Sequence, residues 1–144
     1  MPAMISIRPF EPSDRAPLEE LWARVFADDP PQNAPGIMID NKLSVQPELL
    51  LVGFVDGTLV GAVMAGFDGV RGWIYHLAVS SAWRRRGFAT ELVRAAERGL
   101  ARLGCPKVNL QVRTTNSAVV GFYRSLGYEL EERVSMGRRL GETR

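Results

Sequence analysis

The sequence has little of what several classes of protein require. It contains one cysteine, Cys105, and one histidine, His76. A single cysteine excludes an internal disulfide framework and a zinc site built from several cysteines. No stretch reaches the roughly 18 consecutive apolar residues of a membrane helix, and the N-terminus lacks a basic region followed by a long apolar core. We therefore expect a cytoplasmic protein that has no membrane partner.

Charge of one sign is also scarce. Lysine and arginine number 18 against 16 acidic residues, which leaves a formal net charge of +2. The basic residues gather only at 84–86 and 138–139. A nucleic-acid-binding protein normally shows a broader basic stripe, so nucleic acid is not expected as a partner. The 144 residues, 46% of them hydrophobic, predict a single domain over residues 1–144 with one core.

Hydrophobic periodicity predicts a mixed α/β fold. The expected strands lie at 4–10, 49–55, 58–67, 73–79, 108–113, 128–131 and 133–138, and the expected helices at 13–27, 36–44, 87–103 and 116–126. Strands 73–79 and 108–113 flank a helix and should be parallel. If they splay apart where that helix begins, a groove opens for the stem of a ligand. Residues 28–47, rich in proline, read equally well as a functional loop or as an ordinary connector.

The turn from residue 84 to residue 90, RRRGFAT, predicts an anion site. It begins a helix, whose first amide hydrogens have no helical partners and lie at the positive end of the macrodipole. Gly87 lets the backbone approach a bulky anion closely because it has no Cβ. The patterns of a P-loop and of a dinucleotide-binding fold are both absent here. A solvated basic turn is the ordinary alternative.

Arg84, Gly87 and Ala89 have the spacing of the pyrophosphate signature of the GCN5-related N-acetyltransferases (GNAT), and the turn resembles that signature. The resemblance implies a mixed, mostly antiparallel sheet of about six or seven strands, about four flanking helices, and a splayed parallel strand pair at the coenzyme site. It also implies acetyl-CoA as acetyl donor, with no metal. The coenzyme would be bound by Leu77, Ala78, Val79, Arg84, Arg85, Arg86, Gly87, Phe88, Ala89 and Thr90.

Residues 116–128, NSAVVGFYRSLGY, resemble the second signature of the same family, with one offset changed because Ala118 follows Asn116 by two residues and not three. The resemblance gives Asn116 a contact with the pantetheine arm. It places Tyr123 near the sulfur, as the acid that protonates the departing thiolate. Seven residues separate the two, so they project from nearly the same helix face. Helix capping by Asn116 and core packing by Tyr123 are the ordinary alternatives.

The general base is harder to identify, because Tyr75 stands where many relatives have a glutamate. His76 should point to the opposite face from Tyr75 if the strand is regular, and a packed structural histidine is the favoured interpretation. The N–H of Val79 is a candidate donor to the oxyanion. Other proton acceptors are Asp40, Glu48 and Asp68. We favour a base that acts through ordered water.

The leading functional hypothesis is direct transfer of an acetyl group to a primary amine of a small molecule or a protein N-terminus. The alternatives are a non-catalytic sensor of acetyl-CoA and, less favoured, a nucleic-acid module that uses the arginines. Cys105 is interpreted as a small buried residue and not as a nucleophile. The segments VDGTLVGAVMAGFDG and LGCPKVNLQV also resemble a small bacterial single-domain subgroup of the family. The resemblance is compatible with a homodimer that exchanges the final strands.

Overall fold

The computed structural model describes residues 4–141, which form two compact units that divide after Gln111. The first unit contains a five-stranded sheet in the order β1-β2-β3-β4-β5. Neighbouring strands are antiparallel from β1 to β4, and β5 is parallel to β4. The strands are β1 (Ser6–Pro9), β2 (Leu50–Val55), β3 (Thr58–Phe67), β4 (Gly72–Val79) and β5 (Val108–Asn109).

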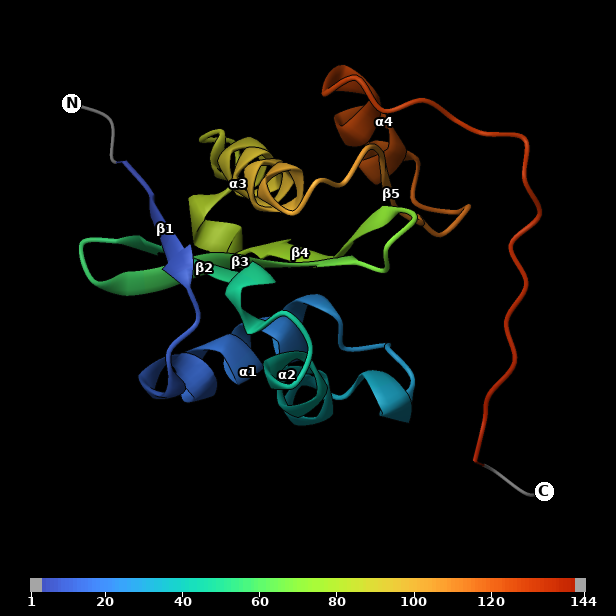
Figure 1. Cartoon of the computed structure of the whole chain (residues 1–144). Coiled ribbons are helices and arrows are strands. Elements are labelled where there is room, and N and C mark those ends of the chain that lie inside the picture. Colours follow the sequence, from blue (N-terminus) through green and yellow to red (C-terminus); the bar gives the residue numbers. More distant parts are fainter. Residues whose placement is uncertain (1–3, 142–144) are drawn as a thin grey trace. The chain divides into compact units, whose positions relative to one another are not determined.

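Helices cover both faces of this sheet. Helices α1 (Arg15–Val25) and α2 (Pro35–Leu43) lie on one face, and α3 (Phe88–Arg102) lies on the other (Figure 1). Short 3₁₀ turns occur at Pro12–Asp14, Pro31–Asn33, Pro47–Leu49 and Ser81–Trp83. Within residues 4–141, no helix is long and apolar enough to span a bilayer.

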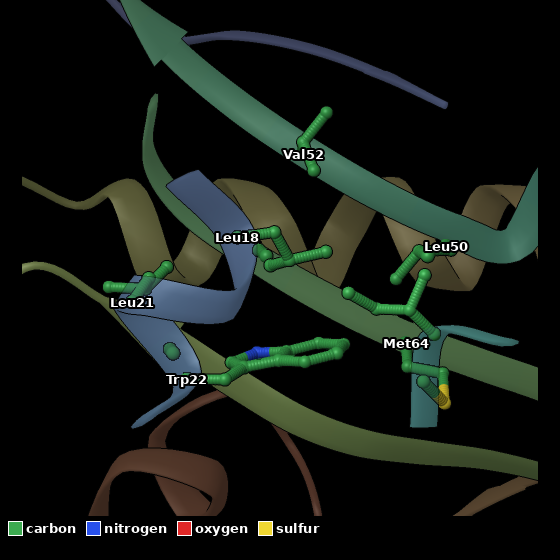
Figure 2. Close-up of a cluster of buried hydrophobic side chains, with 9 residues drawn as sticks. Leu18, Leu21, Trp22, Leu50, Val52 and Met64 are labelled. Carbon is green, nitrogen blue, oxygen red and sulfur yellow. The ribbon is translucent and has the colours of Figure 1, made fainter. Parts of the chain in front are cut away.

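The core beneath α1 joins that helix to the sheet. Leu18 and Trp22 are buried and point toward β2 and β3, where Leu50, Val52 and Met64 receive them (Figure 2). Their spacing of four residues places both side chains on one helix face. This packing fixes α1 against the sheet. The candidate site is formed by the end of one strand of this sheet and by the turn that follows it.

On the opposite face, α3 approaches the sheet closely at Gly61. A Cβ at Gly61 would lie 2.9 Å from Leu92 Cδ1 and 3.0 Å from the carbonyl oxygen of Ala78. Because Gly61 has no Cβ, Leu92 of α3 fits against the sheet at this point. The helix is thereby held close to β4, the strand that precedes it.

Asp14, the residue before α1, holds the chain at the start of this helix. The carboxylate of Asp14 accepts hydrogen bonds from the Arg8 guanidinium at 2.7 and 3.0 Å and from the N–H of Glu11 at 2.8 Å. These bonds lower the pKa of Asp14, first through the hydrogen bond from Arg8. An ion pair between Arg8 and Asp14 therefore joins β1 to the start of α1.

Most predicted elements of the first unit are confirmed, but the strand expected at 108–113 is short. Only Val108 and Asn109 pair with β4, opposite Gly72 and Trp73. The parallel orientation is confirmed. Strand β4 continues for six residues past this pairing, and along residues 74–79 its outer edge has no strand partner within the described part of the chain.

The second unit contains α4 (Ser117–Ser125), and the predicted helix is confirmed. The strands predicted at 128–131 and 133–138 are wrong, and the described residues form five strands, fewer than the six or seven expected. An alternating pattern shows only that a segment is able to form a strand. Its backbone groups also need a ladder partner, and no strand among residues 4–141 pairs with this segment.

Candidate functional site

The turn between β4 and α3 has the geometry of an anion cradle. Gly87 precedes the helix with φ +80°, and Arg85 also has a left-handed backbone, with φ +64°. The first helical hydrogen bond runs from the N–H of Glu91 to the carbonyl oxygen of Gly87 at 3.1 Å. The preceding N–H groups, of Phe88 to Thr90, donate to no acceptor within residues 4–141. They lie at the positive end of a 15-residue helix.

Three exposed arginines add positive charge to this cradle, which comprises residues 84–90. None of them forms an ion pair among the residues described. Arg84 Nε donates to the carbonyl oxygen of Val79 at 3.2 Å. The guanidinium of Arg86 lies 4.9 Å from the centroid of the Trp83 ring. Two arginines are thus positioned by their surroundings, and no acidic residue within 4–141 neutralises the cationic charge of the cradle.

The end of β4 presents backbone groups at its unpaired edge. The N–H of Ser80 donates to the carbonyl oxygen of Val60 at 2.7 Å. Because successive residues of an antiparallel ladder face the partner strand alternately, the neighbouring Val79 turns its N–H and C=O away from β3. Its carbonyl is the group that Arg84 binds. The Val79 N–H therefore points to the edge that continues into the cradle.

A bulge interrupts β4 before this edge. Tyr75 lies opposite Met64 and Ala78 lies opposite Ala62, so two residues, His76 and Leu77, occupy the space of one. His76 has φ +51°. The extra residue changes the alternation of side chains. The opposite faces expected for His76 and Tyr75 required a regular strand, and this condition is not met. His76 contacts α1 and Tyr75 lines a pocket beside α2, on the same face.

His76 is packed, in agreement with its interpretation as a structural residue. Its carbonyl oxygen accepts a hydrogen bond from Trp22 Nε1 at 3.0 Å, and its Nε2 lies 3.1 Å from Asp29 Oδ2. The ring centroid of Phe26 is 4.5 Å from that of the imidazole. Burial lowers the pKa of His76 below 6.5, against the raising influence of Asp29. The imidazole is therefore neutral at neutral pH.

A pocket of about 400 Å³ lies between α2 and strands β3 and β4. Its lining includes Met38, Lys42, Met64, Phe67, Trp73 and Tyr75. The segment 28–47, for which a functional loop and a connector were equally expected, supplies one wall. Helical spacing of Met38, Lys42 and Val45 could have indicated that they share a face, whereas nothing in the sequence placed them beside β4.

The three candidate carboxylates differ in their surroundings. Asp68 lies at the pocket and accepts hydrogen bonds from the N–H groups of Val70 and Arg71, each at 2.8 Å. These bonds lower the pKa of Asp68, the one from Arg71 most. Asp40 is paired with Arg15. Neither carboxylate is thus a free proton acceptor, and Glu48 does not line the pocket.

Asn116 and Tyr123 belong to the second unit. Asn116 Oδ1 accepts from the N–H of Val119 at 3.3 Å, which is the predicted helix cap and leaves the amide nitrogen as a donor. Tyr123 is buried, with ring centroids 5.0 Å from Phe122 and 5.4 Å from Tyr128. Burial raises the pKa of Tyr123 to about 12. Cys105 is half-buried, which corrects the prediction of a buried residue.

Comparison with known proteins shows the family. The model of the acetyltransferase (GNAT) family matches residues 8–128. An acetyltransferase of Yersinia pestis is 43% identical over 136 residues, which cover 94% of this chain and 96% of that protein. The chain belongs to the GNAT acetyltransferase family. The resemblance of residues 84–90 and 116–128 to its signatures led to the correct family.

Solved structures show the fold of this GNAT acetyltransferase. An aminoglycoside N-acetyltransferase in complex with CoA aligns with a TM-score of 0.79 at 19% identity, covering 97% of each chain. An N-acetyltransferase from Thermoplasma acidophilum in complex with coenzyme A aligns with a TM-score of 0.78 at 20% identity, covering 91% of this chain and 93% of that one. Both neighbours bind the coenzyme, and the α/β class predicted for this acetyltransferase is confirmed.

Proposed function

We propose that this acetyltransferase takes its acetyl group from acetyl-CoA and transfers it directly to a primary amine of a small molecule or a protein N-terminus. The observation that carries the proposal is the cradle at residues 84–90, where N–H groups and arginines converge that have no acceptor or acidic partner in the described part of the chain. A diphosphate offers several acceptor oxygens and negative charge to such a site. Asn116, with its free amide donor, is proposed to contact the pantetheine arm.

The edge of β4 suits the rest of the coenzyme. Residues Leu77 to Val79 follow the bulge and lead directly to the cradle. An extended amide-bearing arm can pair with this edge, because no β5 residue pairs with β4 beyond Trp73 within the described part of the chain. The N–H of Val79 is proposed to stabilise negative charge on the thioester oxygen as the amine attacks.

Tyr123 is proposed as the general acid toward the sulfur. In the reaction the amine nitrogen forms a bond to the acetyl carbon, the carbon–sulfur bond breaks, and the thiolate takes up a proton. With a pKa of about 12, the phenol keeps its proton at neutral pH and can donate it. The burial that raises the pKa of the phenol also raises the pKa of a thiol in the same surroundings. Proton transfer from the phenol to the thiolate is therefore less unfavourable than the pKa of a thiol in water suggests.

The acceptor must lose a proton before or during attack, because a lysine-like amine has a pKa of about 10.4. Tyr75 does not replace the missing glutamate. Burial raises the pKa of Tyr75, so its phenol is protonated at neutral pH and cannot accept a proton. We propose that ordered water carries the proton away. A homodimer is also proposed, and sedimentation of the purified chain measures it.

The experiment that tests the proposal combines calorimetry with a thiol-release assay. Titration of CoA into the protein should show binding that Arg85→Ala weakens, because that variant removes a cradle charge. Release of free thiol from acetyl-CoA should then depend on an added primary amine. Coenzyme binding without turnover across a broad amine panel would contradict amine transfer and favour a sensor. Absence of coenzyme binding would contradict the cradle itself.

A further inference from the structure

Lys42 is a buried cation in the wall of the pocket beside β4. The residue is 7% exposed, although lysine is almost never fully buried unless paired. Within residues 4–141 its ammonium makes neither a hydrogen bond nor an ion pair. Burial lowers the pKa of Lys42, and the more distant charge of Glu48 offsets this only in part. An anion placed in the pocket would therefore relieve an uncompensated charge.

The wall around Lys42 is already formed. The side-chain amide of Gln46 donates to the carbonyl oxygen of Phe67 at 2.9 Å and accepts from the N–H of Phe67 at 2.8 Å. This pair of bonds fastens the chain after α2 to the end of β3. A Cβ at Gly66 would lie 3.5 Å from Lys42 Nζ, which places the ammonium above the floor of the sheet. A ligand would thus meet a preorganised cation.

Lys42, in α2, lies beside β4 at the position where one end of an acceptor molecule would lie. Gly66 lies opposite Trp73, and Trp73 precedes Tyr75 by two residues on the same face, about 7 Å of strand. Tyr75 in turn lies opposite Met64 and Val79 at the cradle lies opposite Gly61, so the two are about 10 Å apart along the strand. A thioester arm that is held at the cradle and runs back along β4 would bring its acetyl group toward Tyr75. The remote end of an acceptor in the pocket would then lie near Lys42.

We propose that this pocket binds the acceptor, and that Lys42 binds a carboxylate which the acceptor carries several carbons from its reacting amine. The inference rests on the proposed transfer to a primary amine and narrows its substrate class. Met38, Met64, Phe67 and Trp73 supply apolar surface for the carbon chain between the two ends. The carboxylate can belong to a free amino acid or to an acidic side chain of a peptide.

Asp68 is the charge in the same pocket that argues for a different acceptor, a diamine. Its carboxylate is exposed and already accepts bonds from Val70, Arg71 and the indole of Trp73. Lys42 is buried and has no such partner among the residues that the structure describes. An ion pair formed in the less exposed position is screened less by water, so the carboxylate at Lys42 is the stronger contact.

The experiment compares three amines of equal carbon length: ω-aminohexanoate, hexylamine and diaminohexane. For the unaltered protein, kcat/KM should be about ten- to hundred-fold higher for the amino acid than for hexylamine, as expected for a hydrogen bond to a charged group. Lys42→Met keeps the length and the apolar stem of the side chain, and it should fold because it removes a buried charge. This variant should lose the preference for the amino acid and still turn over hexylamine. Lys42→Arg should restore part of it. The control is Lys107→Met. Lys107 is the other lysine of the chain and lies outside the pocket, so this variant should keep the preference for the amino acid.

Two further measurements distinguish a failure of this inference from a failure of the proposed function. Peptides with glutamate or glutamine in second position distinguish an acidic peptide from a free amino acid as the source of the carboxylate. The thermal midpoint provides a readout without turnover: ω-aminohexanoate should raise it for the unaltered protein and not for Lys42→Met. If no amine is acetylated but this shift occurs, the proposed function fails and the anion site stands. Equal rates for the three amines, a preference for the diamine, or a preference that survives in Lys42→Met would overturn the inference.

Discussion

The indole N–H of Trp22 donates a hydrogen bond to the carbonyl oxygen of His76 at 3.0 Å. This bond connects α1 to the bulge of β4, which lies between the pocket and the cradle. Trp22 is buried and His76 has a positive φ, so the helix holds a backbone conformation that a non-glycine residue seldom adopts. The contact thereby couples the core beneath α1 to the strand that leads to the cradle.

Trp22→Phe should lower the free energy of unfolding by about 2 kcal/mol, because the partly buried carbonyl of His76 loses its donor and a small cavity opens. Urea unfolding measures the change. Trp73→Phe is the matched control, since its indole N–H makes only an exposed contact at 3.4 Å to Asp68. We expect a change within about 0.5 kcal/mol for that variant. Equal effects of the two substitutions would show that the bond to His76 contributes little.

Stability should fall as the pH decreases through the range in which His76 titrates. The pKa of His76 is lowered by burial, so the unfolded state binds a proton at a higher pH than the folded state. The contribution is complete above the unfolded pKa of about 6.5 and is lost as the pH falls toward the folded value. Unfolding curves from pH 7.5 to 5 should therefore slope for the unaltered protein and flatten for His76→Asn. Identical slopes would contradict the prediction.

Gly87→Ala should weaken CoA binding by more than its effect on stability explains. Gly87 has φ +80°, and a Cβ there would meet no atom of residues 4–141 within 4 Å, so the methyl group would project into the space proposed for the diphosphate. Gly57 in the β2–β3 hairpin has the same φ and the same open surroundings. Both alanine variants should lose about 1 kcal/mol of stability. Calorimetry should show weakened CoA binding for Gly87→Ala alone, and equal affinities would remove Gly87 from the site.

Tyr123→Phe should lower kcat by about a hundredfold, the lower end of what general acid catalysis contributes, and should leave CoA affinity nearly unchanged. Since the pKa of Tyr123 is raised to about 12, ionisation of this phenol should cause no loss of rate up to about pH 10. Tyr128→Phe, on the ring that packs against Tyr123, is the control. An equal rate for Tyr123→Phe and the unaltered protein would exclude Tyr123 from the chemistry.

The sequence was sufficient for those features that depend on local spacing. The start of α3 could be predicted because Gly87 and the arginines mark it, and the hairpin of β2 and β3 because Asp56 and Gly57 form its turn. Those signals act over a few residues. The charge distribution of the cradle was predictable for the same reason, since it belongs to one continuous segment.

Features that depend on distant partners could not be predicted. The bulge at His76 breaks the alternation by which side chains were assigned to faces, and its partner Trp22 lies 54 residues earlier in the chain. The burial of Lys42 depends on how α2 packs against β3 and β4. Residues 128–138 alternate as a strand should, but alternation carries no information on whether a ladder partner exists.

The single additional residue in β4 also sets a condition on the length of this strand. Ile74 and Val79 are both buried, although five positions separate them, because the bulge shifts the phase of the pleat between the two ends. Deleting one residue between Tyr75 and Ala78 would remove the bulge and leave a regular strand, in which Ala78 still lies opposite Ala62 and Val79 still lies opposite Gly61. The carbonyl that anchors Arg84 would keep its direction. Deleting two residues would instead turn that carbonyl toward β3, so the strand should tolerate the loss of one residue here and not of two.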